Sequence, residues 1–203
     1  MDKKLETIKY KFQADKDFRY TDYSLAKVNY SRALRIQPRD YESHFQMVRV
    51  FLRLQRNKTA ELKSRHLIIL NPRHGLAHFN RGVILDSLHR YEESEMVYRE
   101  SLKYQPNDAN AHHNLTIVLM KLGRYAEAFE SCDRAIQLAK SDDSAYNVKG
   151  YLYFLLGEYE NAILSYEQAI SLNSSECVTY MNNAIAYYLW EKKAESLNPR
   201  VLV

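Results

Sequence analysis

The stretch LGRYAEAFESCDRAIQL, from Leu122 to Leu138, is repeated in outline by LGEYENAILSYEQAISL, from Leu156 to Leu172. The two segments are offset by 34 residues without a gap, and both join a Leu-Gly-x-Tyr start to an Ala-Ile-x-Leu end. A shared apolar period is common to unrelated helices, but two shared end motifs are not. These segments therefore indicate an internal repeat.

The 34-residue period extends over most of the chain. Small residues recur in the expected second helix of each copy, at Ala26, Ala60, Ser94, Ala128 and Ala162. A second column follows seven places later, at Ala33, Leu67, Ser101, Ala135 and Ala169. Three prolines keep the same phase, at Pro38, Pro72 and Pro106. Helices approach closely where side chains are small, and proline ends a helix, so the columns predict repeated helix-turn-helix pairs.

Two further columns belong to the first helix and to the turn of each copy. The small place in the first helix is occupied by Ala14, Val48, Gly82, Thr116, Gly150 and Ala184. The aromatic place before the second helix is occupied by Tyr23, Asn57, Tyr91, Tyr125 and Tyr159. A single helical hairpin cannot bury its apolar face alone, so we expect the copies to stack on one another.

Composition agrees with a helical protein. The chain has 203 residues, of which 46% are hydrophobic and 27% charged, with only five Gly and four Pro. No apolar run reaches the roughly 18 residues of a membrane span, and the charged N-terminal sequence predicts no secretory signal. The two cysteines predict no disulfide framework and favour a reducing compartment. Cytoplasm is the default expectation, with a cilium or another cytoskeletal assembly as the alternative.

Charge is distributed unevenly along the chain. Residues 1–74 hold 17 Lys and Arg against 8 Asp and Glu, a net of +9, whereas residues 75–203 hold 12 against 17, a net of −5. The basic half could attract an acidic partner, and the alternative is a solvated surface with a mild bias.

These columns resemble the tetratricopeptide repeat, a 34-residue helix-turn-helix unit. The resemblance implies an all-α fold, a right-handed superhelical solenoid, as one domain over residues 1–203. Its copies span residues 7–40, 41–74, 75–108, 109–142, 143–176 and a partial sixth at 177–203. The second copy departs from the pattern, with Asn57 at the aromatic place and Leu67 at a small one.

The sixth copy starts at Cys177 and then leaves the pattern. The family's second helix is expected after Trp190, but only EKKAESLNPRVLV follows. We expect this to leave part of the sixth first helix uncovered, so that Tyr187, Tyr188, Leu189 and Trp190 would seek another surface.

The resemblance also implies that a concave groove, lined by the first helices, binds peptides or helices of other proteins. One groove column consists largely of amides, at Gln46, Asn80, Asn114 and Asn182, interrupted by Val148. An amide can donate and accept at once, so stacked amides could hold an extended peptide by its backbone. This pattern is similar to the asparagine ladder of the O-linked N-acetylglucosamine transferase. The alternative is that Asn is merely tolerated on an exposed helix face.

Neighbouring groove columns offer apolar and aromatic anchors beside these amides. One column reads Lys11, Phe45, Phe79, His113, Asn147 and Met181, and another reads Asp15, Arg49, Val83, Ile117, Tyr151 and Ile185. The predicted partner-binding anchors are Phe45, Phe79, His113 and Tyr151, and the alternative is that several of these belong to the inter-repeat core. The carboxylate clamp of co-chaperones is not expected, because Asp15, Leu76 and Asn80 stand where it needs Asn, Lys and Arg.

Histidines recur at the 34-residue spacing, at His44, His78 and His112. They occupy the usual Trp or Tyr place of the family, so we expect them to pack inside the repeats. The alternatives are metal binding and pH sensing, but repeat spacing does not make ligands converge as a zinc site requires. We therefore predict no metal and no cofactor.

No catalytic motif is recognised, and we expect no enzyme. Cys132 falls in a helix-packing column, which predicts a buried and inert thiol. We predict a protein-protein interaction scaffold. One alternative is a structural subunit fixed in a large multiprotein assembly through its C-terminal end and convex face. A lesser alternative is an RNA-binding helical repeat. Nucleic acid is nevertheless an unfavoured partner, because basic residues gather in two copies only and do not form a regular column.

Overall fold

The computed structural model describes residues 3–173 and 175–197, without the side chains of residues 196 and 197. Within these ranges the regular structure is entirely helical, which confirms the predicted all-α fold class. The helices are α1 (Lys3–Arg19), α2 (Tyr23–Ile36), α3 (Tyr41–Arg53), α4 (Asn57–Leu70), α5 (Gly75–Ser87), α6 (Tyr91–Tyr104), α7 (Ala109–Lys121), α8 (Tyr125–Leu138), α9 (Asp143–Leu155), α10 (Tyr159–Leu172) and α11 (Cys177–Leu197).

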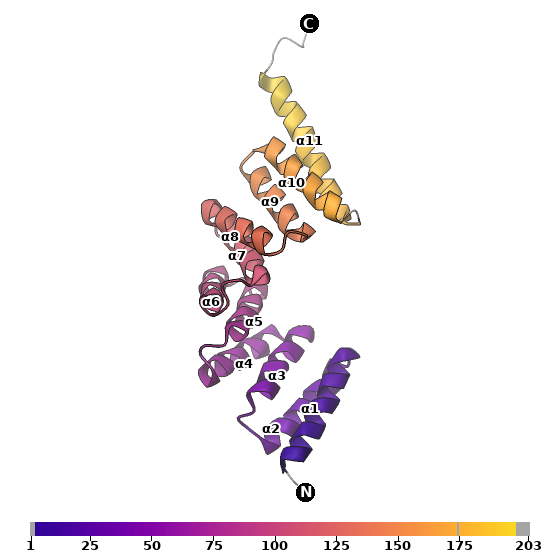
Figure 1. Ribbon diagram of the computed structural model, residues 1–203, viewed down its shortest axis with the longest axis vertical. Coiled ribbons are helices and arrows are strands. Elements are labelled where there is room, and N and C mark those ends of the chain that lie inside the picture. Colours follow the sequence, from indigo (N-terminus) through magenta and orange to yellow (C-terminus); the bar gives the residue numbers. More distant parts are fainter. Residues whose placement is uncertain (1–2, 174, 198–203) are drawn as a thin grey trace. The chain divides into compact units, whose positions relative to one another are not determined.

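The chain divides into two compact units, residues 1–106 and 107–203, and each is built from helical hairpins. In the first unit, α1 packs on α2, α3 on α4 and α5 on α6 (Figure 1). In the second unit, α7 packs on α8, α9 on α10, and α11 packs against α10. Second helices also pack on the next first helix within each unit, as in α2 with α3 and α8 with α9.

The starts of the first helices share a capping place. Asp40, Asp108 and Asp142 each accept a hydrogen bond from a backbone N–H in the first turn of the helix that follows. His74 takes this role before α5, where its Nδ1 accepts from the N–H of Ala77 at 3.2 Å. A capping side chain satisfies a backbone donor that the helix itself leaves unpaired.

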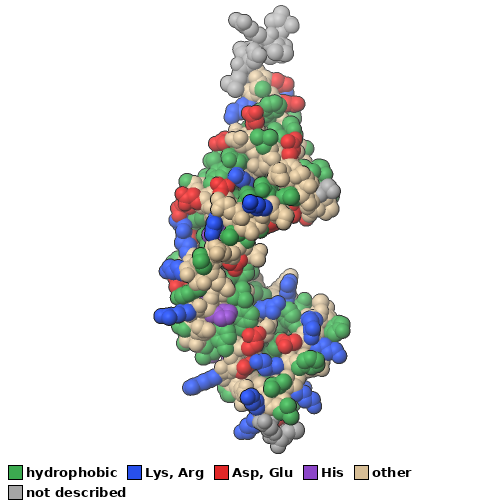
Figure 2. Space-filling model, in the orientation of Figure 1, with side chains coloured by type: hydrophobic (Ala, Val, Ile, Leu, Met, Phe, Trp, Pro, Cys, Tyr) green, Lys and Arg blue, Asp and Glu red, His purple; other side chains and the backbone are tan. Residues whose placement is uncertain are grey.

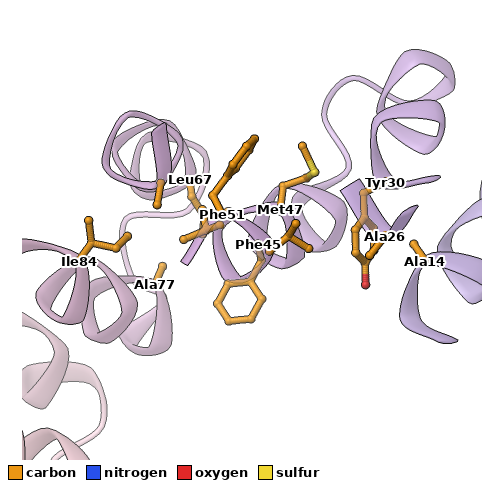
Figure 3. Packing of buried hydrophobic residues seen from close by; sticks show 12 residues of the cluster. Ala14, Ala26, Tyr30, Phe45, Met47, Phe51, Leu67, Ala77 and Ile84 are labelled. Carbon is orange, nitrogen blue, oxygen red and sulfur yellow. The ribbon is translucent and has the colours of Figure 1, made fainter. Parts of the chain in front are cut away.

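The predicted small columns lie at the helix crossings. Ala26, Ala60 and Ser94 of the first unit are fully buried, as are Ala128 and Ala162 of the second. In the first unit, Ala14 and Ala26 sit beside Tyr30, while Leu67, Ala77 and Ile84 gather around the next crossing (Figure 3).

Where serine replaces alanine, its hydroxyl gains a partner. Ser94 Oγ donates to the carbonyl of Gly82, and Ser101 Oγ donates to the carbonyl of Gly75, each at 2.9 Å. These hydrogen bonds therefore offset the desolvation cost of burying the two hydroxyls.

The sixth copy differs from the family pattern that the sequence suggested. Instead of a turn after Trp190, α11 continues without interruption from Cys177 to Leu197. None of the residues from Glu191 to Ala194 is a helix breaker, so the helix propensity of this segment is never interrupted. Residues 198–203, the rest of the segment that follows Trp190, lie outside the described residues.

Candidate protein-binding groove

Two hollows border α3 in the first unit. One, of about 650 Å³, is lined by Arg49, Leu52, Arg53, Gln55, Asn57, Phe79, Asn80, Val83 and Ser87. The other, of about 600 Å³, is lined by Asp15, Phe18, Arg19, Thr21, Tyr23, Tyr30, Gln46 and Arg49. Arg49 lines both hollows, so we treat them as one site and name it the α3 groove. Lys and Arg side chains are prominent on the surface of this unit (Figure 2).

Arg49 is held in place by two contacts. Its guanidinium carbon lies 4.8 Å from the centroid of the Phe18 ring, and its Nη1 donates to Gln46 Oε1 at 2.9 Å. The Nε2 of Gln46 in turn donates to Glu42 Oε1 at 2.6 Å. The predicted peptide-binding amide of Gln46 is therefore engaged at both ends by side chains of its own helix, and its first effect is to position Arg49.

Unlike Gln46, Asn80 has an amide nitrogen without a hydrogen-bond partner. This half-buried side chain lines the hollow between α3 and α5, and its Nδ2 atom is buried without a hydrogen-bond partner. A buried donor that lacks a partner costs about 1–3 kcal/mol, so rotation of the Asn80 amide toward an acceptor brought into the hollow by a ligand would be favourable. Phe79 lines the same hollow, and its ring centroid lies 5.8 Å from that of Tyr98.

Phe45, a predicted anchor, lies mostly in the core. It is only 6% exposed, and its ring centroid is 5.7 Å from that of His74 and 6.5 Å from that of Tyr41. His74, the capping residue before α5, therefore packs against Phe45, and little of the Phe45 side chain is left for a partner to contact. This corresponds to the inter-repeat alternative weighed from the sequence.

The remaining predicted residues belong to the second unit. Asn114, His113 and Asn182 are half-buried, whereas Tyr151 is exposed and stacks on Phe154 with ring centroids 6.1 Å apart. Burial lowers the pKa of His113, against an opposing effect of Asp142, so burial favours the neutral imidazole. Asn147, which the sequence placed in a groove column but not among the sites, has a buried Oδ1 without a partner. Its place in that column was the only feature of the sequence that could have marked Asn147 as a candidate site residue.

The repeated histidines fasten helices to the preceding turns. His44 Nε2 lies 2.8 Å from the carbonyl oxygen of Pro38, and His78 Nε2 lies 2.8 Å from that of Pro72. A carbonyl oxygen can only accept, so each ring donates its Nε2 proton. Among the described residues, no group of three or more His, Cys, Asp or Glu could hold a metal ion.

Cys132 is buried, as its column predicted. Burial raises the pKa of its thiol to about 12, which disfavours the reactive thiolate. Within the described part of the chain, no helix is both long enough and apolar enough to cross a membrane.

Comparison with known families defines the class of protein. Residues 107–175 match one family model described as tetratricopeptide repeat, and residues 76–108 match a second model with the same description. These matches coincide with the copies in which the 34-residue pattern is clearest. Residues 76–175 are therefore assigned to the tetratricopeptide repeat family.

Solved structures share this fold at low sequence identity. MamA (residues 41 to the end) from Desulfovibrio magneticus RS-1 matches with a TM-score of 0.79 and 18% identity, covering 87% of this chain and 98% of that one. PilW, described as a type IV pilus biogenesis factor, has a TM-score of 0.79 and 20% identity, with coverages of 94% and 92%.

YrrB, described as a protein with an unusual peptide-binding site, has a TM-score of 0.73 and 16% identity, with coverages of 88% and 92%. At these identities the likeness concerns the fold. No curated protein sequence matches this chain.

Proposed function

We propose that this chain is a non-enzymatic scaffold whose α3 groove receives an extended segment of a partner protein. The observation that carries the proposal is the unpartnered Nδ2 of Asn80, set in a hollow that also contains Arg49, Arg53 and Phe79. This combination offers a donor for a peptide carbonyl, two cations and an apolar contact.

The charges favour an acidic segment. Guanidinium groups bind carboxylates through paired hydrogen bonds, and Arg49 is already oriented by Phe18 and Gln46. The net charge of +9 over residues 1–74 adds long-range attraction for an acidic partner. Leu52, Phe79 and Val83 supply apolar surface in the same hollow. We therefore propose a partner sequence with an Asp or Glu next to an apolar residue.

The amide column is part of this proposal. Asn80 would bind the peptide backbone in the first unit, and Asn114 and Asn182 would do the same in the second, with His113 and Tyr151 as neighbouring contacts. Gln46 would act by holding Arg49 in place. YrrB, a protein of the same fold described as having a peptide-binding site, supports a peptide as the ligand class.

Selection from a displayed peptide library tests the proposal with the 203-residue chain as bait. We expect enrichment of peptides that combine acidic and apolar residues. Binding of a selected peptide, followed by fluorescence anisotropy, should weaken about tenfold in Asn80→Ala, because the backbone acceptor loses its donor. It should weaken further in Arg49→Glu/Arg53→Glu, where like charges meet.

The matched control is Arg35→Glu/Lys58→Glu, which makes the same change in net charge at two exposed residues of α2 and α4 outside the groove. Circular dichroism establishes that each variant is folded. Equal weakening by both double variants would reduce the effect to net charge and contradict the groove. If the chain selects no peptide but retains RNA from a cell extract, the result would contradict the proposal and favour the alternative of an RNA-binding helical repeat.

A further inference from the structure

One face of α11 is apolar and exposed. The side chains of Val178, Tyr180, Met181, Ile185, Tyr187 and Tyr188 are between 39% and 63% exposed. The opposite face packs on α10 through Thr179 and Ala186, which are buried. Soluble proteins rarely leave contiguous apolar surface of this kind without a partner.

The small-residue column shows what is different about this helix. Its members Ala14, Val48, Gly82, Thr116 and Gly150 are all buried in their hairpins. Ala184 holds the same place in α11, yet it is exposed. In the other first helices this place meets the second helix of the hairpin, as Gly82 meets the ring of Tyr98. Within the described residues, no helix covers Ala184.

We propose that this face of α11 pairs in antiparallel orientation with α11 of a second copy of this chain. By helix periodicity, the exposed residues that lie opposite the buried Thr179 and Ala186 are Cys177, Met181, Ala184 and Tyr188, at alternating steps of four, three and four residues. Such a stripe is the geometry that two helices use when they cross at a shallow angle. This inference concerns the second unit only and does not depend on the α3 groove.

Size complementarity favours an identical, antiparallel partner. With the two-fold axis between Asn182 and Asn183, Met181 of one copy faces Ala184 of the other, and Tyr188 faces Cys177. Each layer therefore combines a large side chain with a small one, as the hairpins of the chain do where Tyr98 meets Gly82. Along one side of this stripe, Val178 of one copy meets Ile185 of the other, so these contacts are apolar as well.

Charge favours the same orientation. Residues 177–190 contain no charged side chain, with Glu176 just before this segment and Lys192 just after it. Antiparallel pairing brings Glu176 of each copy within about one helical turn of Lys192 of the other along the axis. Parallel pairing would instead bring the Lys192 side chains of the two copies together, where like charges repel.

The exposed area is on the scale of a dimer interface. A partner in a standard interface buries roughly 800 Å², and single aromatic side chains contribute about 150–250 Å² when fully buried. Three half-exposed tyrosines and three aliphatic side chains on α11 leave several hundred square ångströms for pairing.

Sedimentation velocity over roughly 1–100 µM of the whole chain is the first test. We expect a dimer that forms with increasing concentration. Met181→Glu should raise its dissociation constant about tenfold or more, because the carboxylate would be buried against an apolar layer. Leu164→Glu is the matched control, since Leu164 on α10 is 61% exposed and Met181 is 63% exposed. A chain that stays monomeric, or two variants with equal effects, would overturn the proposal.

Disulfide trapping tests the orientation. In Tyr188→Cys, mild oxidation should link the introduced thiol of one copy to the native Cys177 of the other, and peptide mapping by mass spectrometry identifies the linkage. Cys132 is buried and does not compete. Leu164→Cys should give no such linkage. A predominant Cys177–Cys177 linkage in the unaltered chain would mean parallel pairing and would contradict the proposed register.

Discussion

The turn inside each hairpin places one residue in the left-handed region of the backbone. These residues are 34 apart, and they are Thr21 (φ 63°), Gln55 (φ 55°), His89 (φ 58°), Gly123 (φ 72°) and Gly157 (φ 71°). The left-handed conformation costs an L-residue about 1–2 kcal/mol, which glycine avoids. The first three copies therefore retain backbone strain that the last two do not, and Thr21 is β-branched, the least favourable case.

Thr21→Gly should stabilise the chain by about 1 kcal/mol, because the turn no longer forces a β-branched residue to positive φ. Urea unfolding followed by circular dichroism measures the change. Gly123→Ala is the control and should lower the free energy of unfolding by a similar amount. A loss of stability in Thr21→Gly would mean that the bond from Thr21 Oγ1 to the carbonyl of Tyr20 outweighs the strain.

Asp40 combines a helix cap with an ion pair. It accepts from the N–H of Ser43 at 2.9 Å, and Lys11 Nζ lies 3.0 Å from its Oδ2. Burial acts to raise the pKa of Asp40, but the bonds from Ser43 and Lys11 outweigh it and hold the pKa below its ordinary value. A pKa lower in the folded than in the unfolded chain contributes stability above the unfolded pKa, and that contribution is lost as pH falls through the folded pKa.

Asp40→Asn should therefore cost about 1 kcal/mol near pH 7 and progressively less as pH falls below about 4. Thermal unfolding of both proteins across this pH range measures the difference. In a Lys11→Met background the cost near pH 7 should be smaller, since the ion pair is already gone. A cost that does not change with pH would assign the effect to the cap geometry alone.

At the scale of the helix pair, the combined volume of the two side chains at each crossing is kept similar, while the residue types differ. One position of the second helix alternates between large and small residues, as Tyr30, Ser64, Tyr98, Cys132 and Tyr166. The facing place in the first helix alternates in the opposite sense, as Ala14, Val48, Gly82, Thr116 and Gly150. A Cβ added at Gly150 would lie 2.7 Å from the ring of Tyr166, so that glycine is required by the ring beside it.

A swap experiment tests this compensation. Gly150→Thr should destabilise the chain by about 1–3 kcal/mol, because the added atoms overlap the Tyr166 ring. Adding Tyr166→Cys reproduces the Thr116–Cys132 pair found one hairpin earlier and should recover part of the loss. Denaturant unfolding of the two single variants and the double variant gives the coupling free energy. Strictly additive effects would contradict the volume compensation.

At the scale of the whole molecule, the two proposed surfaces rest on different forces. The α3 groove relies on arginines, whereas the α11 face has no charge between Cys177 and Trp190. Salt screens the first interaction and leaves apolar burial largely unaffected.

Raising NaCl from about 0.05 to about 0.5 M should therefore weaken binding of an acidic peptide at least roughly tenfold and leave the dimer unchanged or slightly stronger. Fluorescence anisotropy and sedimentation velocity in the same buffers measure the two effects. If salt dissociates the dimer as well, the contacts at Glu176 and Lys192, rather than the apolar layers, would dominate the pairing.

Sequence patterns were sufficient to predict the helical hairpins but insufficient to predict the binding site. Periodic small residues and the turn motif identified the repeat, because each marks a local requirement of a helix crossing or a turn. The amide column includes Gln46 and Asn80, which both line the α3 groove, but it could not distinguish them. Gln46 is engaged by Glu42 and Arg49, whereas Asn80 keeps a free donor, and this difference depends on rotamers and neighbours that one column does not encode.

The all-α repeat, its period and the residues at each crossing could be read from the sequence alone, since these follow from backbone geometry and side-chain volume along the chain. The packed structure was needed to show that Phe45 packs against His74 while Phe79 lines a hollow. It was also needed to show that Ala184, unlike the other members of its column, is exposed on an uninterrupted α11. Exposure depends on which helices surround a residue in space, and that arrangement is a property of the packed chain rather than of any one repeat.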